Sequence, residues 1–295
     1  LPISHSDVLV TALGLHKVWS FFGINPKPYY LYENAPLMGP DTVLLISIAY
    51  PLMTFALRAA MKNRKKMDLF LLRVLYNAVL LVLSFYIFAA TFIGYFQEGY
   101  SWVCNITPPA PGTSLLIAQA IYVSYVLKVV EFADTLFIVL RKQDNQLSFL
   151  HVYHHSLVFP VWYFVVRYAA AGDAYTAVLY NAIAHTLMYS YYLLSSFGYR
   201  IWWKQYITMV QIIQLALNII NSTLTLFVFE RSFCPLTDEA LVITWATWLF
   251  SITLLLLFSN FYLRAYLIGG KKKKHKTEAW QDQRSSSGKS SSEAE

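Results

Sequence analysis

The sequence predicts an all-α integral membrane protein in which seven transmembrane helices enclose a substrate cavity. Its 295 residues are 57% hydrophobic and only 13% charged, and they include 22 Tyr, 20 Phe and 8 Trp. This composition is far too apolar to coat a soluble globule. Apolar runs of ~20 residues, the length that matches a hydrocarbon core, recur between short polar loops.

The distribution of these runs divides the chain into three parts. Residues 1–41 hold five prolines among aromatic residues; this segment is too broken to span, and we expect it to lie on the membrane surface. Residues 42–268 form the seven-helix transmembrane domain. Residues 269–295 form a basic, Ser-rich tail that we expect to be disordered, because it has almost nothing apolar to bury. The expected spans are residues 42–60, 69–96, 114–140, 149–169, 174–197, 205–229 and 240–268.

Lys and Arg in the short loops orient the helices. The loops after spans two, four and six carry one such residue, Arg231. The loops after spans one, three and five carry eight, namely Lys62, Arg64, Lys65, Lys66, Arg141, Lys142, Arg200 and Lys204. The positive-inside rule places this second set and the tail in the cytoplasm and the N-terminus on the opposite side. The excess of basic residues is explained by this topology, and we expect no nucleic-acid partner.

The chain has two cysteines, Cys104 and Cys234, and this topology puts both in loops on the non-cytoplasmic side. In an oxidising compartment such as the endoplasmic reticulum lumen, a disulfide between the two loops is expected. The alternative is two unpaired thiols, since the sequence does not supply the geometry of the bond.

Four histidines lie in two apolar segments. His151, His154 and His155 are spaced so that a helix, at about 100° per residue, points all three into one sector. His185 lies in a second apolar segment, four residues after Asn181. Polar groups in hydrocarbon are costly and mark a functional site by default. The alternative is that the four are hydrogen-bonded core residues.

Charged residues recur in the third expected span. Lys128, Glu131 and Asp134 are three residues apart, which keeps them within one broad sector of a helix. Charges of both signs in hydrocarbon should pair or face a cavity. An internal salt-bridge network and a direct role in catalysis both fit this pattern.

The sixth expected span carries an amide stripe, which we define as Gln211, Gln214, Asn218 and Asn221. Their spacing places them along one side of a helix. Such amides can hold helices together through hydrogen bonds across the interface, or they can line a polar path for a substrate. The sequence leaves both roles open.

Together these residues resemble the membrane-bound elongases of very-long-chain fatty acids. The resemblance covers most of the chain and implies a 3-ketoacyl-CoA synthase of the endoplasmic reticulum membrane. Such an enzyme condenses an acyl-CoA with malonyl-CoA, the first step of microsomal fatty acid elongation, and releases CO2 and CoA. The motifs that carry the resemblance are Lys128-x-x-Glu131-x-x-Asp134-Thr135, Phe149-Leu150-His151-x-Tyr153-His154-His155, Asn181-x-x-x-His185-x-x-Met188-Tyr189 and Thr208-x-x-Gln211-x-x-Gln214.

The resemblance also implies partners. A homodimer and association with the reductases and dehydratase of the elongation cycle are expected, within membrane lipid. We expect no metal and no cofactor beyond the two CoA substrates. The length and unsaturation of the acyl chain do not follow from the sequence.

The chemistry can be assigned to residues. The expected spans hold no cysteine, which excludes a thiolate nucleophile there. A neutral imidazole is the best remaining acyl acceptor, because desolvation disfavours its charged form. We assign that role to His154, with His151, His155, His185 and Asn181 orienting it or polarising the substrate oxygens.

Further contacts are expected around this centre. Lys128 would hold the carboxylate of malonyl-CoA before it leaves as CO2. The expected substrate-binding residues are Glu131, Asp134, Gln211, Gln214 and Tyr189 inside the bundle, with Arg141, Lys142, Lys204 and Arg264 for the CoA phosphates at the cytoplasmic mouth.

Two other classes of protein fit parts of the sequence. A membrane-bound di-iron desaturase or hydroxylase is also rich in histidine, but it would have to recruit Glu131 and Asp134 as further ligands. A seven-span receptor or transporter would use the same charged residues as ligand or ion contacts.

Overall fold

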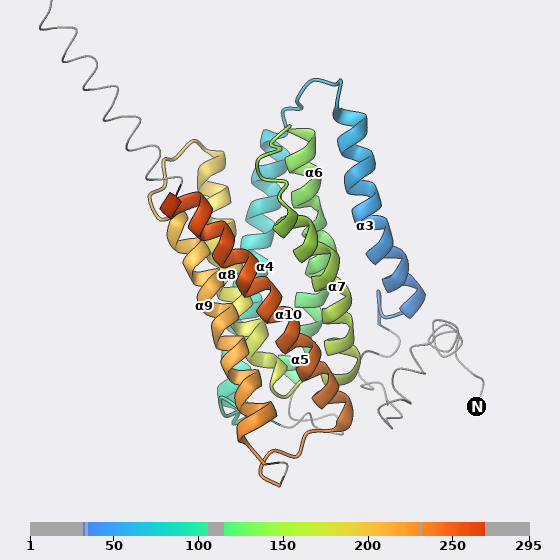
Figure 1. Cartoon of the computed structure of the whole chain (residues 1–295), viewed down its shortest axis with the longest axis vertical. Coiled ribbons are helices and arrows are strands. Elements are labelled where there is room, and N and C mark those ends of the chain that lie inside the picture. Colours follow the sequence, from blue (N-terminus) through green and yellow to red (C-terminus); the bar gives the residue numbers. More distant parts are fainter. Residues whose placement is uncertain (1–31, 33–34, 106–114, 231, 269–295) are drawn as a thin grey trace, which may run out of the picture.

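All regular structure in the described part of the chain is helical (Figure 1). The computed structural model describes residues 32, 35–105, 115–230 and 232–268. The expected tail and nearly all of the N-terminal segment therefore lie outside the described residues. The helices are α3 (Pro40–Met61), α4 (Phe70–Gln97), α5 (Leu115–Val130), α6 (Phe132–Leu140), α7 (Phe149–Ala169), α8 (Ala174–Ser196), α9 (Lys204–Thr223) with its π-helical extension η2 (Leu224–Val228), and α10 (Asp238–Tyr262) with its extension η3 (Leu263–Ile268).

Several helix boundaries follow from local capping signals. Pro40 occupies the first turn of α3, where its missing N–H costs nothing. The Ser148 hydroxyl accepts a hydrogen bond from the backbone N–H of His151 at the start of α7. Thr237 caps α10 in the same way. These side chains satisfy donors that the first helical turn leaves free.

The third expected span is not one uninterrupted helix. It divides at Glu131 into α5 and α6. The backbone N–H of Asp134 donates to the carbonyl of Glu131 at 3.0 Å, a bond between residues three apart that tightens the chain at this point. The expectation of one continuous helix was wrong here.

Within the part of the chain that the structure describes, four helices are long and apolar enough to cross a membrane: Pro40–Met61, Phe70–Gln97, Lys204–Val228 and Asp238–Ile268. The two pieces of the third span, at 16 and 9 residues, are each too short alone. α7 and α8 carry the histidines and other polar residues, and ten residues of α7 are buried within the protein. Length and composition thus support four of the seven expected spans.

The helices run side by side as a bundle (Figure 1). α4 packs along α8, and α9 packs along α10. α7 contacts α3, α5 and α10, so it lies inside the bundle. The apolar core includes Leu80, Ile121 and Val178, and the ring of Phe159 stacks on Tyr125 at a centroid distance of 5.1 Å.

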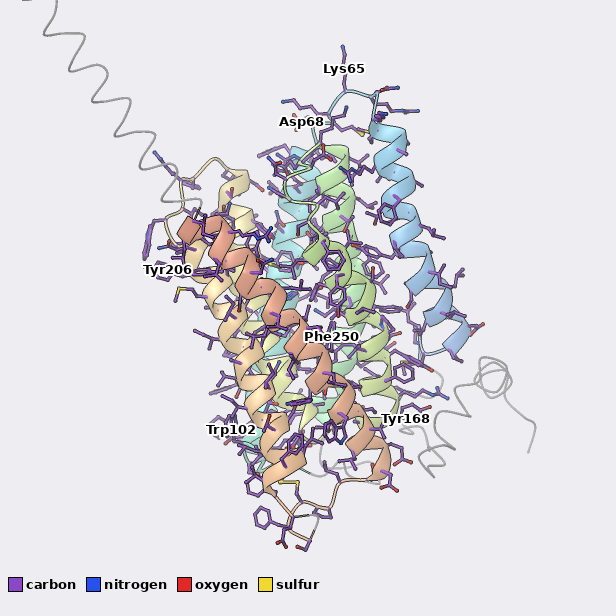
Figure 2. The ribbon with its side chains drawn as sticks, in the orientation of Figure 1. Lys65, Asp68, Trp102, Tyr168, Tyr206 and Phe250 are labelled. Carbon is purple, nitrogen blue, oxygen red and sulfur yellow. A yellow bond between two sulfur atoms is a disulfide. The ribbon has the colours of Figure 1, made fainter. Side chains whose placement is uncertain are left out.

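The loops gather at two ends of the bundle (Figure 2). Lys65 and Asp68 mark one end, which we call the basic end; Trp102 and Tyr168 lie toward the other. The backbone N–H of Met67 donates to the carbonyl of Leu140 at 3.0 Å, joining the loops after the first and third expected spans. The loops after the first and third expected spans lie at the same end of the bundle, as the predicted topology requires. Which end of the bundle faces the cytoplasm stays a prediction.

The opposite end is closed by a covalent and hydrogen-bonded cap. Cys104 and Cys234 form a disulfide, as predicted, with their Cα atoms 5.2 Å apart; we call this the disulfide end. Asp173, just before α8, accepts hydrogen bonds from the backbone N–H groups of Cys104 and Asn105 at 3.0 and 2.7 Å, and from Thr225 Oγ1 at 3.2 Å. Burial raises the pKa of Asp173, and these donors oppose that shift.

Replacing Cys234 with Ser should lower the free energy of unfolding by about 2–5 kcal/mol, because the disulfide closes a long loop. Thermal or denaturant unfolding in detergent, with and without reductant, measures this change. Reductant should destabilise the wild-type protein and leave the variant unchanged. Non-reducing peptide mapping that finds both thiols free in freshly alkylated protein would contradict the pairing.

Candidate active site

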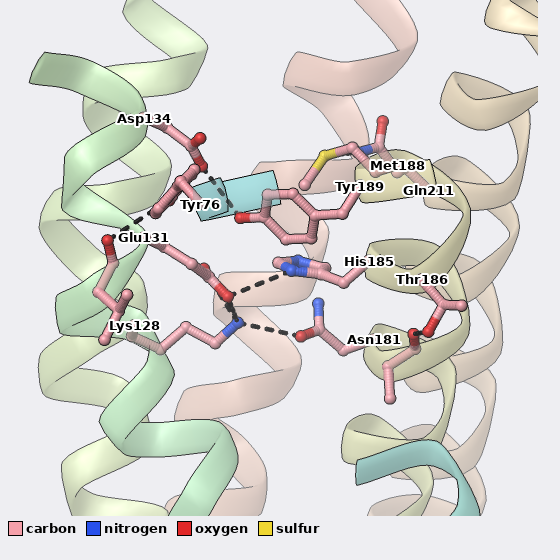
Figure 3. A network of polar contacts seen from close by, with 12 residues as sticks. Tyr76, Lys128, Glu131, Asp134, Asn181, His185, Thr186, Met188, Tyr189 and Gln211 are labelled. Carbon is pink, nitrogen blue, oxygen red and sulfur yellow. Dashed lines mark hydrogen bonds and ion pairs between the residues drawn. The ribbon is translucent and has the colours of Figure 1, made fainter. Parts of the chain in front are cut away.

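A buried ion pair lies at the centre of the site (Figure 3). Lys128 on α5 is 1% exposed and Glu131 is 2% exposed. Lys128 Nζ donates to both Glu131 oxygens, at 2.9 and 3.1 Å, and to Asn181 Oδ1 on α8 at 3.1 Å. An ammonium group has three donors, so each donor of Lys128 has an acceptor.

His185 extends the ion pair along α8. Its Nδ1 lies 3.2 Å from Glu131 Oε1, and a carboxylate can only accept, so the Nδ1–H donates. A neutral His185 held in this way keeps its lone pair on Nε2. Two α8 residues one turn apart, Asn181 and His185, are therefore fixed by a single ion pair from the broken third span.

Asp134 belongs to a neighbouring layer of contacts (Figure 3). Tyr189, fully buried on α8, donates its hydroxyl to Asp134 Oδ2 at 3.0 Å. The ring of Tyr76 meets that of Tyr189 edge-on at 6.2 Å. The three regularly spaced charged residues therefore have different partners. Asp134 accepts a hydrogen bond from Tyr189, whereas Lys128 and Glu131 form an ion pair with each other.

The three histidines of α7 contact one another but face different surroundings. The ring centroids of His151 and His155 are 4.5 Å apart, and those of His154 and His155 are 5.0 Å apart. His151 Nε2 lies 2.8 Å from Thr135 Oγ1 on α6, which in turn hydrogen-bonds the hydroxyl of Tyr50 on α3 at 2.9 Å. His151 is therefore tied to the α3–α6 side of the bundle.

His155 points toward the same side. Its ring lies 5.9 Å from the ring of Tyr50 and 6.1 Å from that of Phe132. Its Nδ1 is buried and has no hydrogen-bond partner among the described residues. His151 and His155 therefore face α3 and α6, and the three α7 histidines do not share the single direction that we expected.

His154 lines an internal cavity of about 130 Å³ between α7, α8, α9 and α10. The cavity extends to Asp173 and Asn105 at the disulfide end. Three of the residues that were predicted to be catalytic or to bind substrate are in the described lining of the cavity: His154, Asn181 and Gln214. Of the three α7 histidines, that lining includes His154 alone.

Lys128 is already engaged within the protein. It is absent from the described lining of the cavity, and its three donors meet Glu131 and Asn181. A malonyl carboxylate would have to displace one of these contacts. The expected contact of Lys128 with malonyl-CoA stays a prediction, and the contacts that the structure shows are those that hold Glu131 and Asn181.

The remaining predicted residues lie around this centre. Gln211 Nε2 donates to the sulfur of Met188 at 3.7 Å. Three of the four residues predicted for CoA have partners of their own: Arg141 bonds Gln143 Oε1, Lys142 bonds the carbonyl of Lys62, and Arg264 bonds Asn260 Oδ1. Lys204 is exposed at the first residue of α9.

Sequence reasoning missed two residues that contact the histidines. Thr135 follows Asp134 within the first motif, and its hydroxyl could have been recognised as a partner for a buried ring. Tyr50 lies in an otherwise ordinary apolar span, where no pattern distinguishes it. Among the described residues, no group of three or more His, Cys, Asp or Glu is arranged to hold a metal ion.

The arrangement can support acyl transfer. His154 presents an imidazole to an enclosed space, and Asn181 presents an amide to the same space with its oxygen held by Lys128. A nucleophile beside a preorganised hydrogen-bond donor is the combination that acyl transfer needs.

Known proteins resemble this chain along most of its length. The profile of the GNS1/SUR4 (ELO) family matches residues 35–276. Very long chain fatty acid elongase 4 of Macaca mulatta and that of Homo sapiens are each 37% identical over 251 residues, which cover 83% of this chain and 78% of the relative. Very long chain fatty acid elongase 5 of Mus musculus is 35% identical over 248 residues, covering 81% and 77%.

The Lys128–Glu131 pair can be tested as a structural unit. Lys128→Met and Glu131→Gln should each cost about 3–5 kcal/mol of unfolding free energy, because each leaves one buried charge unpaired. The double variant should be more stable than the sum of the two losses predicts. Thermal unfolding of all four proteins in detergent measures this coupling. Strictly additive losses would show that the two side chains do not depend on each other.

Proposed function

Since the chain belongs to the GNS1/SUR4 (ELO) family of fatty acid elongases, we propose that it condenses a long-chain acyl-CoA with malonyl-CoA. The products are CO2, CoA and a 3-ketoacyl-CoA two carbons longer, which makes the chain a very-long-chain 3-oxoacyl-CoA synthase. The observation that carries this proposal is the position of His154, which lines one cavity together with Asn181.

The same proposal includes a topology. α3, α4, α7, α8, α9 and α10 each form one span, and α5 with α6 forms the seventh. The basic end then lies in the cytoplasm, the disulfide end in the endoplasmic reticulum lumen, and the CoA phosphates beside Arg141, Lys142, Lys204 and Arg264. The reaction uses no metal and no further cofactor, and a homodimer and the other enzymes of the cycle are the expected partners.

In the first step His154 acts as the acyl carrier. An imidazole nitrogen attacks the thioester carbon, a C–N bond forms, the C–S bond breaks, and CoA leaves as a thiolate. The acylated ring gives up its N–H proton to that thiolate, which leaves a neutral acyl-imidazole. An amide donor at Asn181 would stabilise the negative charge that develops on the carbonyl oxygen.

In the second step malonyl-CoA supplies the new carbon–carbon bond. Its carboxylate leaves as CO2, and the electrons of the broken C–C bond form an enolate. The enolate carbon attacks the acyl group, the C–N bond to His154 breaks, and the imidazole takes up one proton from water, which is the proton that the overall reaction consumes. The ion pair of Lys128 and Glu131 holds Asn181 and His185 in place during both steps.

The alternative mechanism is direct attack of the enolate on bound acyl-CoA, with the histidines as acids, bases or donors. Two arguments favour the acyl-carrier mechanism. Among the α7 histidines, it is His154 that belongs to the described lining of the cavity. In the direct mechanism, two bulky CoA groups would have to bind at the same cytoplasmic opening at once.

Mass spectrometry of protein mixed with acyl-CoA alone distinguishes the two mechanisms. The carrier predicts an acyl adduct on His154 and one equivalent of free CoA before malonyl-CoA is added. His154→Ala should show neither. Turnover without adduct or early CoA release in the wild type would rule out the carrier.

The cavity also predicts where chain length is limited. Ala240, 7% exposed in the first turn of α10, lines the cavity near the disulfide end. Ala240→Phe should lower kcat/KM for the longest acyl-CoA accepted about tenfold, because overpacking costs about 1–3 kcal/mol. Shorter substrates should be less affected.

A matched control is Ala246→Phe, which adds the same ring to an exposed position of α10 outside the cavity lining. Its chain-length profile should match that of the wild type across a panel of saturated acyl-CoAs. Equal profiles for both variants would show that the acyl chain does not extend toward Ala240.

A further inference from the structure

The two sides of the cavity differ in their polar content. On the α7 side the lining beyond His154 is apolar, formed by residues such as Val158, Trp162 and Val165. On the α9 and α10 side, which we call the polar wall, apolar residues such as Leu215 and Ile243 are interspersed with polar ones, namely Gln214, Asn218, Asn221, Ser222, Thr225, Thr244, Thr247 and Ser251. A cavity that serves only unsubstituted hydrocarbon has no use for polar groups that the protein does not itself satisfy.

Several of these polar groups are satisfied within the protein. Asn221 Nδ2 donates to the carbonyl of Trp102 at 2.6 Å, which ties α9 to the disulfide end. The hydroxyls of Thr244 and Thr247 donate to carbonyls one turn earlier in α10, at 2.7 and 2.9 Å. These groups explain part of the polar wall as ordinary helix packing.

Two acceptors on the same wall are not satisfied. Gln214 Oε1 and Asn218 Oδ1 are buried and have no hydrogen-bond partner among the described residues. They are four residues apart on α9, so they face the cavity on successive turns, with a rise of ~6 Å between them. A methylene chain placed against them would leave both desolvated and unpaired.

The position of this pair along the cavity is set by its neighbours. Gln211, one turn before Gln214, contacts Met188 beside the Tyr189 layer of the site (Figure 3). Asn221, one turn after Asn218, reaches the disulfide end. The two acceptors therefore lie between the reaction centre and the closed end of the cavity.

We propose that this part of the cavity is a subsite for a hydroxyl group in the middle of the acyl chain, so that the protein elongates mid-chain hydroxyacyl-CoAs in preference to their unsubstituted counterparts. This inference rests on the proposed condensation. A hydroxyl can donate to either amide oxygen and can accept from an amide N–H. Because it has one proton, it satisfies one of the two oxygens and can accept from the amide N–H of the other residue, while the rest of the chain stays against the apolar wall.

A charged substituent fits less well. The described lining holds no Lys or Arg, and its one carboxylate, Asp173, lies at the closed end. A second carboxylate on the acyl chain would be buried there without a counter-charge and beside a like charge. The uncharged hydroxyl is thus the polar group that the lining can accept.

The test compares 12-hydroxystearoyl-CoA with stearoyl-CoA, each incubated with malonyl-CoA and the full-length protein. The measured quantity is the ratio of the two kcat/KM values. Asn218→Leu keeps the approximate volume of the side chain and removes the amide, so the ratio should fall about tenfold from a wild-type value above one. Gln214→Met is a second variant with the same expected direction and guards against misfolding of the first.

The matched control is Thr247→Val, which removes a hydroxyl from the same wall. Because that hydroxyl is bonded within α10, the ratio should stay at its wild-type value. A wild-type ratio at or below one, or a ratio unchanged in both amide variants, would overturn the subsite and assign the two acceptors to bound water. Failure of the wild type to elongate any acyl-CoA in a panel of chain lengths, with or without the hydroxyl group, would overturn the condensation as well.

Discussion

The buried ion pair of Lys128 and Glu131 is the interaction on which the rest of the site depends. Two charges withdrawn from water are tolerated only when each is paired and hydrogen-bonded. Here Glu131 accepts from Lys128 and His185, and Lys128 also donates to Asn181. The pair therefore fixes two α8 residues one turn apart, and any change in its geometry would move the amide that faces the cavity.

The ion pair lies where α5 meets α6. Lys128 and Glu131 are three residues apart, a spacing that places them on neighbouring parts of one helix face, and the backbone N–H of Glu131 still donates to the carbonyl of Leu127 at 2.8 Å. One carboxylate here meets Lys128 and His185 together. Asp134, about one turn further on, meets Tyr189 instead. Charges that the sequence presents as one group therefore have different partners.

Composition and loop charges were enough to predict the helical class, most helix boundaries and the pairing of Cys104 with Cys234. They were not enough to predict which histidine faces the cavity. His151 and His155 are one turn apart and share a direction on α7, whereas His154 and His155 are consecutive and point about 100° apart around the helix. Which of the two directions meets the cavity depends on distant contacts such as that of Tyr50, whose hydroxyl reaches the Thr135 hydroxyl beside His151 from 85 residues away in the sequence. No local pattern marks such a contact.

The amide stripe of α9 shows that two roles which a sequence presents as alternatives can be divided along one helix. Asn221 holds the helix to the Trp102 carbonyl at the disulfide end, as a packing amide would. Gln214 and Asn218, up to two turns earlier, offer buried acceptors to the cavity instead. The first contact fixes the register of α9 against the closed end of the bundle. That register in turn determines where the two acceptors lie along the cavity, so the subsite that we propose would depend on the packing contact at Asn221.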